Sequence, residues 1–275
     1  EAVDGVPVLR VSHPVPHDAG QIRRLGMEIV FGLRAAAAPW GRPDAVVVVT
    51  PALFASAIVR ARAALTRTPV VAWVHDIYTA GLSETGTASG PVTRVMRAVE
   101  GVFLRSCSGV VVIHDRFSEY LQRHLAVAPE RITTVRNWTH IQDAPAVDTT
   151  ALRRRFGWDP EDVVVLHTGN MGAKQDLANV AAAAGVADRD GAPLRFMLVG
   201  GGHQRPQLEK LAARTPRFEV LPSVDNETYA GLLRAADILL VNERPGLTEM
   251  CVPSKLTSYF TADRPVLAAV EAEGP

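Results

Sequence analysis

Two of the three lysines in this chain stand where a predicted helix begins, a placement that suits phosphate binding. The 275 residues hold 29 lysines and arginines, and only Lys174, Lys210 and Lys255 are lysines. Lys174 follows a glycine-containing turn and precedes a helix predicted over residues 175–184. The exposed N–H groups of such a turn and the helix N-terminus together form an anion site. Because a lysine is unfavourable in the first turn of a helix, we prefer phosphate recognition to a solvated loop lysine. The P-loop pattern does not occur.

The other lysine of this pair lies in a segment that opens a helix predicted over residues 254–262. Pro253 suits the start of a helix, and the hydroxyl of Ser254 beside it could hold a second phosphate or ribose oxygens. Lys255 would add a positive charge there, and Glu249 could accept hydrogen bonds from sugar hydroxyls. The alternative is a plain helix cap with a lysine next to it by chance.

Two His-Asp dipeptides, His75-Asp76 and His114-Asp115, directly follow predicted strands. Histidine and aspartate together could indicate a metal phosphohydrolase, but those sites are built on helices, so we favour a role without metal. An imidazole titrates near neutrality, so His75 or Asp76 could serve as a general base. A hydrogen-bonded turn is the alternative for each dipeptide.

Three consecutive glycines, Gly200, Gly201 and Gly202, follow another predicted strand and resemble part of a dinucleotide-binding turn. The pattern fails at its last position, where Arg205 replaces the third glycine, and no acid follows about 20 residues later at a strand end. The glycines therefore indicate a tight turn that a ligand could approach, and an NAD-dependent oxidoreductase is disfavoured.

The positions of these polar residues follow from an alternation of short apolar strands with amphipathic helices along the chain. Almost continuously apolar strands are typical of parallel sheets buried on both faces, and ligands bind at the carboxyl ends of such strands. Strand–helix alternation further predicts right-handed crossovers. Strands are predicted over residues 6–11, 45–50, 70–75, 109–113, 163–168, 195–199, 218–221, 238–241 and 265–270.

The helix predicted over residues 91–105 shows the clearest helical period. Its apolar residues are expected to face the core, with its arginines off that face. The predicted core stripe consists of Val92, Val95, Met96, Val99, Val102 and Phe103, and the arginines are Arg94, Arg97 and Arg105.

The regular pattern breaks at residues 139–150, which we interpret as a linker between two α/β domains, 1–140 and 141–275. The first domain carries 15 arginines against 11 acids, and the second carries 14 basic residues against 18 acids. The whole chain therefore balances at a formal charge of zero, which does not suggest a nucleic-acid binder.

Composition excludes several classes of protein. Two cysteines, Cys107 and Cys251, cannot form a disulfide framework or a cysteine-built zinc site, and they fit a reducing compartment. No apolar run approaches the ~20 residues needed to span a bilayer. The chain begins with Glu1 inside a strand-like region and stops just after another strand, so both domains are expected to be incomplete.

Several segments resemble the retaining glycosyltransferases of family 4, especially the bacterial branch typified by colanic-acid and fucosamine transferases. The resemblance covers most of the chain, from about Val6 to Pro265. It rests on Gly169-Asn170-Met171-Gly172-Ala173-Lys174-Gln175-Asp176-Leu177, Leu198-Val199-Gly200-Gly201-Gly202, Arg244-Pro245-Gly246, Val252-Pro253-Ser254-Lys255-Leu256-Thr257, Trp73-Val74-His75-Asp76-Ile77-Tyr78 and Val135-Arg136-Asn137-Trp138.

This resemblance implies a GT-B architecture, which is two Rossmann-like domains with parallel sheets and an active site between them. The second domain would hold a nucleotide-diphospho sugar, with Lys174 neutralising its pyrophosphate and no metal or other cofactor required. The residues implied to bind the donor are Gly169, Asn170, Met171, Gly172, Lys174, Gly200, Gly201, Gly202, Glu249, Pro253, Ser254 and Lys255.

On the acceptor side, the resemblance implies that Asp76, with His75, and Asn137 face a lipid-linked or saccharide acceptor. The expected protein is a cytoplasmic enzyme of cell-envelope polysaccharide assembly. The positive charge of the first half would suit contact with the cytoplasmic face of the inner membrane.

The chain departs from the family pattern at the glutamate pair that often binds the donor ribose. Met250 and Ser258 stand at those two positions, and Glu249 is adjacent to the first. Two other functions therefore stay open at this point: a sugar-nucleotide epimerase of the same architecture and a non-catalytic nucleotide-sugar-binding module.

Overall fold

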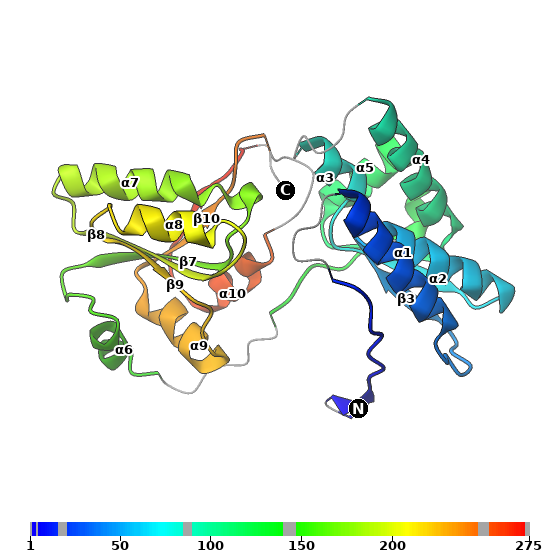
Figure 1. Ribbon diagram of the computed structural model, residues 1–275, viewed down its shortest axis with the longest axis horizontal. Coiled ribbons are helices and arrows are strands. Elements are labelled where there is room, and N and C mark those ends of the chain that lie inside the picture. The colour runs from blue at the N-terminus through cyan, green and yellow to red at the C-terminus, as the bar shows by residue number, and fades with distance from the viewer. Residues whose placement is uncertain are drawn as a thin grey trace. The chain divides into compact units, whose positions relative to one another are not determined.

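The computed structural model describes residues 2–3, 5–15, 21–84, 90–139, 147–246 and 253–272. The chain forms two compact units, the first from the chain up to Arg136 and the second mainly from Asn137 onward. Each unit is built around one parallel sheet with helices packed on it (Figure 1). The expected α/β class with two parallel sheets is confirmed.

The sheet of the first unit has the strand order β3-β4-β5-β6 and is parallel throughout. Alternate residues of β4 (Val70–Val74) and β5 (Gly109–Val112) are fully buried, so one face of the sheet carries the main core. The other described elements of this unit are α1 (Gln21–Ala37), β3 (Val46–Val49), α2 (Leu53–Leu65), α3 (Tyr78–Glu84), α4 (Pro91–Ser106), α5 (Asp115–Leu125), η1 (Pro129–Arg131) and β6 (Ile132–Thr134).

The strand predicted over residues 6–11 is wrong. Only a short antiparallel pair forms there, β1 (Ala2–Val3) with β2 (Val6–Pro7). Pro7 has no N–H group to extend a ladder, and Leu9 is 61% exposed, so this segment has no apolar environment to enter.

Helix α4 has nearly the predicted bounds, but part of the predicted apolar stripe does not face the core. Val92, Val95 and Val102 are each about 60% exposed, whereas Glu100 and Phe103 are buried. The physical reason is a polar one: the carboxylate of Glu100 turns inward to accept hydrogen bonds from the first backbone N–H groups of α3, at 2.8 and 3.1 Å. The helix therefore faces the core with Glu100, Phe103 and, in part, Val99, whereas Val92, Val95 and Val102 of the predicted stripe face outward.

The second unit has a five-stranded parallel sheet in the order β11-β10-β7-β8-β9. Its described elements are α6 (Thr149–Arg155), β7 (Val163–Asn170), η2 (Ala173–Gln175), α7 (Leu177–Arg189), β8 (Leu194–Gly201), α8 (Arg205–Ala212), β9 (Phe218–Leu221), α9 (Asn226–Ala235), β10 (Ile238–Asn242), α10 (Lys255–Thr261) and β11 (Val266–Ala269).

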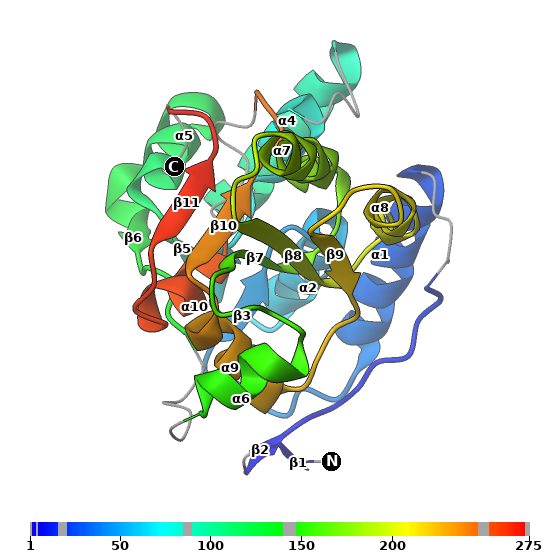
Figure 2. The same cartoon turned by 90° about the vertical axis from the view of Figure 1, so that its left-hand side faces the viewer.

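Helices cover both faces of this second sheet. Figures 1 and 2 show α7 and α8 on one face and α6, α9 and α10 on the other. Successive residues of β7 enter different cores, since Val165 packs with the α7 side and Leu166 with the α9 side. Burial on both faces explains why these strands are almost continuously apolar.

Candidate functional site

The central strands β7 and β10 of the second unit part at their carboxyl ends. They pair only at Ile238↔Val165 and Leu239↔Leu166, although β7 continues to Asn170 and β10 to Asn242. Because β7 is followed by β8 on one side and has β10 on the other, this is the point where the strand order reverses. Ligands of open α/β sheets bind at such a point, outside the carboxyl ends of the strands.

A buried tyrosine hydroxyl bridges the two strands where they part. The backbone N–H of Thr168 donates to the hydroxyl of Tyr259 at 2.9 Å, and that hydroxyl donates to the carbonyl oxygen of Leu240 at 3.4 Å. Tyr259 is fully buried, and burial raises the pKa of its hydroxyl to about 12. A neutral hydroxyl therefore joins β7 and β10 where the hydrogen bonds between the two strands end. We call the place where Thr168–Asn170 of β7 separate from Leu240–Asn242 of β10 the strand fork.

Lys255 extends into this fork. Its ammonium nitrogen lies 3.1 Å from Nε2 and 3.3 Å from Nδ1 of His167, a fully buried residue of β7. The same ammonium lies beside Gly169, because a Cβ added to that glycine would be 3.9 Å from it. Burial lowers the pKa of Lys255 to about 8, while the charge of Glu243 acts in the opposite direction and that of Lys174 adds to the lowering.

Lys174 lies on the turn between β7 and α7, and that turn is tied to the end of β10. The backbone N–H of Arg244 donates to the carbonyl oxygen of Lys174 at 2.8 Å, and the amide of Asn242 donates to that of Gln175 at 2.7 Å. The helix start differs from the prediction, because a 3-10 turn over Ala173–Gln175 precedes α7. Lys174 is half-buried on the turn that follows β7, and its charge contributes to lowering the pKa of Lys255.

The predicted turn glycines make the loops after β7 and β8 fit together. A Cβ on Gly200 would lie 2.0 Å from the carbonyl oxygen of Gly169, and one on Gly202 would lie 2.5 Å from that of Met171. Both glycines also have positive φ, 151° and 146°. The backbone N–H of Met171 donates a hydrogen bond to the carbonyl oxygen of Gly201 at 2.7 Å. Backbone of this chain therefore fills the space beside two of these glycines.

The remaining donor-side residues have mixed positions. Asn170 and Ser254 are exposed, Pro253 is half-buried, and Met171 is fully buried. Ser254 precedes α10 but its hydroxyl makes no capping hydrogen bond. Glu249 lies outside the described residues.

In the first unit, His75 and Asp76 follow β4 as predicted and are both half-buried. The ring of His75 packs 4.6 Å from that of Trp73, and the hydroxyl of Thr50 donates to the carbonyl oxygen of Asp76 at 2.9 Å. Asn137 is half-buried and lies just beyond β6. The structure therefore places His75 and Asp76 together in the first unit and the lysine fork in the second.

The second His-Asp dipeptide has local structural partners. Nδ1 of His114 accepts a hydrogen bond from the backbone N–H of Arg116 at 3.2 Å, which caps the start of α5. Asp115 forms an exposed ion pair with Arg136 at 3.2 Å. Among the described residues, no three histidine, cysteine or acidic side chains are grouped so that they could hold a metal ion.

Sequence reasoning missed two residues of the fork, His167 and Tyr259. A signal for the first was present, since a histidine interrupts an otherwise apolar run two residues before Gly169. No comparable signal marks Tyr259, which resembles any aromatic residue on a buried helix face.

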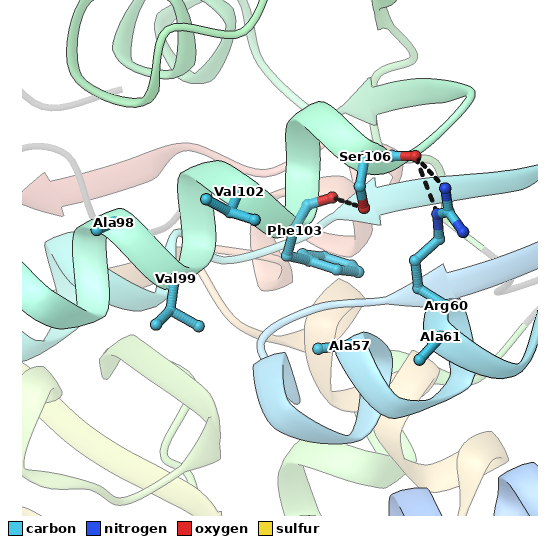
Figure 3. A pocket seen from close by; sticks show the side chains of 8 residues that line it. All are labelled: Ala57, Arg60, Ala61, Ala98, Val99, Val102, Phe103 and Ser106. Atoms are coloured by element: carbon cyan, nitrogen blue, oxygen red, sulfur yellow. Dashed lines mark hydrogen bonds between the residues drawn. The ribbon is translucent and has the colours of Figure 1, made fainter. Parts of the chain in front are cut away.

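An apolar groove between α2 and α4 is the other notable surface feature of the first unit (Figure 3). It has a volume of about 520 Å³. Arg60 lies at one end, where its guanidinium donates to the carbonyl oxygen of Ser106 at 2.7 and 2.9 Å. The groove is lined by Ala57, Arg60, Ala61, Ala98, Val99, Val102, Phe103 and Ser106.

Within the described part of the chain, no helix is long and apolar enough to cross a bilayer.

Residues 1–138 match the family model of the glycosyl transferase 4-like domain. WcaI of Escherichia coli K12, named as a glycosyl transferase of colanic acid biosynthesis, is 30% identical over 84% of this chain. This chain spans 58% of the length of WcaI.

Solved structures of low sequence identity share the fold. Sucrose-phosphate synthase of Thermosynechococcus elongatus aligns over 100% of this chain and 67% of its own, with a TM-score of 0.73 and 15% identity. Anabaena HepE in complex with UDP-glucose aligns over 81% of this chain and 59% of its own, with a TM-score of 0.63 and 16% identity. The expected GT-B type of fold is thereby confirmed.

Proposed function

Because this chain belongs to the glycosyl transferase 4-like family, we propose that it takes part in transferring a sugar from a nucleotide-diphospho sugar to a saccharide or lipid-linked acceptor. The assignment to cell-envelope polysaccharide assembly is supported by the likeness to WcaI. A nucleotide donor is supported by the fold shared with HepE, which was crystallised with UDP-glucose.

The observation that carries the proposal is the position of the Lys255 ammonium beside Gly169 at the strand fork, with Lys174 on the turn that follows β7. When a glycosidic bond to a nucleotide diphosphate breaks, negative charge develops on the departing diphosphate. The Lys255 ammonium beside Gly169, together with the positive charge of Lys174 on the same turn, would stabilise that charge more in the transition state than in the ground state, which accelerates the reaction. A pKa of about 8 leaves Lys255 about nine-tenths protonated at pH 7.

We assign the donor diphosphate to the two lysines, the backbone of Gly169 and the side chains of Asn170 and Ser254. The lysines supply the positive charge that a divalent ion would otherwise bring, so we propose metal-independent transfer. Retention of anomeric configuration is proposed from the family resemblance, as is a contribution of Glu249 to donor binding.

We propose that His75, Asp76 and Asn137 serve the acceptor side. His75 and Asp76 are accessible in part and follow a parallel strand at its carboxyl end, which is where α/β domains bind ligands. The imidazole of His75 has the chemistry to receive a proton from an acceptor hydroxyl.

Contact with the cytoplasmic face of a membrane is the remaining part of the proposal. Exposed Val92, Val95 and Val102 run along the outer face of α4, and the exposed Arg94 and Arg105 flank them. An apolar stripe with cationic flanks suits an anionic lipid surface, to which each arginine contributes about 1 kcal/mol. Sedimentation with phosphatidylglycerol vesicles should weaken in a V95E/V102E variant and persist in wild type. Equal binding of wild type and the V95E/V102E variant to the vesicles would refute the proposed lipid contact through α4.

The donor assignment is tested by nucleoside-diphosphate binding to the complete protein, measured by calorimetry with UDP, GDP and ADP. Lys174→Ala should weaken the preferred diphosphate at least about 10-fold, because one charge-assisted contact is lost. Lys210→Ala is the matched control, since Lys210 is an exposed lysine of α8. Binding unchanged in Lys174→Ala would refute the assignment.

Product analysis with and without acceptor tests the reaction itself. Transfer predicts release of nucleoside diphosphate that depends on a saccharide or lipid-linked acceptor. A new sugar nucleotide formed without acceptor would identify an epimerase instead, and donor binding without any turnover would identify a binding module.

A further inference from the structure

His167 is an unusual residue for the centre of a parallel sheet. It lies in β7 between Leu166 and Thr168, and its side chain has no exposed surface. Burying a polar ring has a free-energy cost unless the ring is hydrogen-bonded. Nδ1 lies 3.2 Å from the carbonyl oxygen of Leu240, at the point where β10 departs from β7. The hydrogen bond fixes the orientation of the ring at the fork.

The ring supports the ammonium group of Lys255. The ammonium nitrogen is almost equally distant from both ring nitrogens, 3.1 and 3.3 Å. Since Cε1 joins the two nitrogens, a group at equal distance in the ring plane would collide with that carbon. The ammonium therefore lies over the face of the imidazole, in the geometry of a cation–π contact.

This contact is favourable only when the imidazole is neutral. Burial, and then the charge of Lys255, lowers the pKa of His167 to about 3, although backbone hydrogen bonds at Leu240 and Asn170 act in the opposite direction. The charged groups that face the ammonium are Lys174, which repels it, and Glu243, which attracts it. A neutral ring adds support without changing this balance of charge.

We propose that His167 is a positioning residue, whose neutral ring holds the Lys255 ammonium beside Gly169 so that it meets the donor diphosphate. The inference rests on the proposed function for the identity of the anion, and on the contacts of His167 for the positioning itself. A merely structural histidine would stabilise the sheet without affecting where Lys255 holds its charge.

The three lysines of the chain permit a direct test without substrate. In protein labelled with ¹³C-lysine, the three ε-carbon signals can be assigned with Lys174→Arg, Lys210→Arg and Lys255→Arg, and then titrated. In His167→Leu, the ammonium loses its support and moves toward solvent, so the titration midpoint of Lys255 should rise by one pH unit or more. His167→Phe keeps an aromatic face and should restore most of the wild-type midpoint.

The same variants, made in the complete protein, should also change UDP binding and the pH dependence of kcat/KM. His167→Leu should bind UDP about 10-fold more weakly at pH 7, and the alkaline limb of its kcat/KM profile should move upward with the Lys255 midpoint. His167→Phe should recover both. If His167→Leu fails to fold, His167→Gln serves for the same titration, since the amide keeps a hydrogen bond but offers no aromatic face.

A Lys255 midpoint that is unchanged or lower in His167→Leu, or in His167→Gln, overturns the proposal, because the ammonium would then have kept its place without the ring. Failure of the wild-type protein to bind any nucleoside diphosphate would instead refute the proposed function, and the lysine titration would still decide whether His167 positions Lys255.

Discussion

Replacing Tyr259 with phenylalanine should destabilise the second unit by about 2 kcal/mol. The change removes a single oxygen, so it leaves almost no cavity. It also leaves the backbone N–H of Thr168, which donates to that oxygen at 2.9 Å in a fully buried position, without its partner. An unsatisfied buried donor costs about 1–3 kcal/mol. Because the pKa of the hydroxyl is raised to about 12 by burial, the loss should be the same from pH 6 to pH 9.

Amide hydrogen exchange gives the most direct measurement, since it reports Thr168 individually and does not require both units to unfold together. A loss of 2 kcal/mol corresponds to exchange about 30-fold faster for amides that open with the whole unit. Tyr229→Phe is the matched control, because Tyr229 packs against the same core. If Tyr259→Phe leaves both the exchange of Thr168 and the stability of the unit at wild-type values, the hydroxyl does not hold the strands at the fork.

Three further perturbations test other contacts of the second unit. Gly200→Ala should lower the free energy of unfolding by at least about 3 kcal/mol, because the added Cβ would lie 2.0 Å from a backbone carbonyl oxygen. Gly201→Ala is the control for thermal unfolding and should be nearly neutral, because its Cβ would meet nothing closer than 3.9 Å. Asp162→Asn should lower the free energy of unfolding, measured in urea, by about 2 kcal/mol, because its carboxylate is only 2% exposed and accepts hydrogen bonds from two arginines at 2.7 and 2.8 Å. A decrease below 0.5 kcal/mol would contradict this prediction. The lowered pKa of His167 means that the folded state binds fewer protons than the unfolded chain between pH 6.5 and about 3, so stability should fall as pH falls through that window, by up to about 1.4 kcal/mol per pH unit. His167→Gln should reduce that slope, and an identical slope in both proteins would count against a buried neutral imidazole.

The sheets were predictable from the sequence because their strands are buried. Where a strand is covered by helices on both faces, as β7 is, nearly every side chain must be apolar, and the run is visible without any structure. The prediction failed over residues 6–11, where an apolar run ends in a two-residue strand at Pro7. It also missed β6, whose three residues Ile132–Thr134 are too short and too polar to form a recognisable run.

Helix α4 illustrates a different limit. Its period correctly gave a helix, but period alone does not say which side faces the core when valines and a glutamate compete. The carboxylate of Glu100 found two backbone N–H groups at the start of α3, 21 and 22 residues earlier in the chain. Such a partner cannot be identified from the local pattern.

The class of the fold and the importance of Lys174 and Lys255 could be predicted from the residues alone, because the rarity of lysine, a glycine turn and a helix start are all visible in the sequence. The surroundings of the two lysines depend on contacts between segments that are far apart in the chain. Lys255 meets His167 across 88 residues of chain, and Tyr259 meets Thr168 across 91. Burial shifts the pKa values of Lys255, His167 and Tyr259, and this burial exists only after distant segments have packed around the fork.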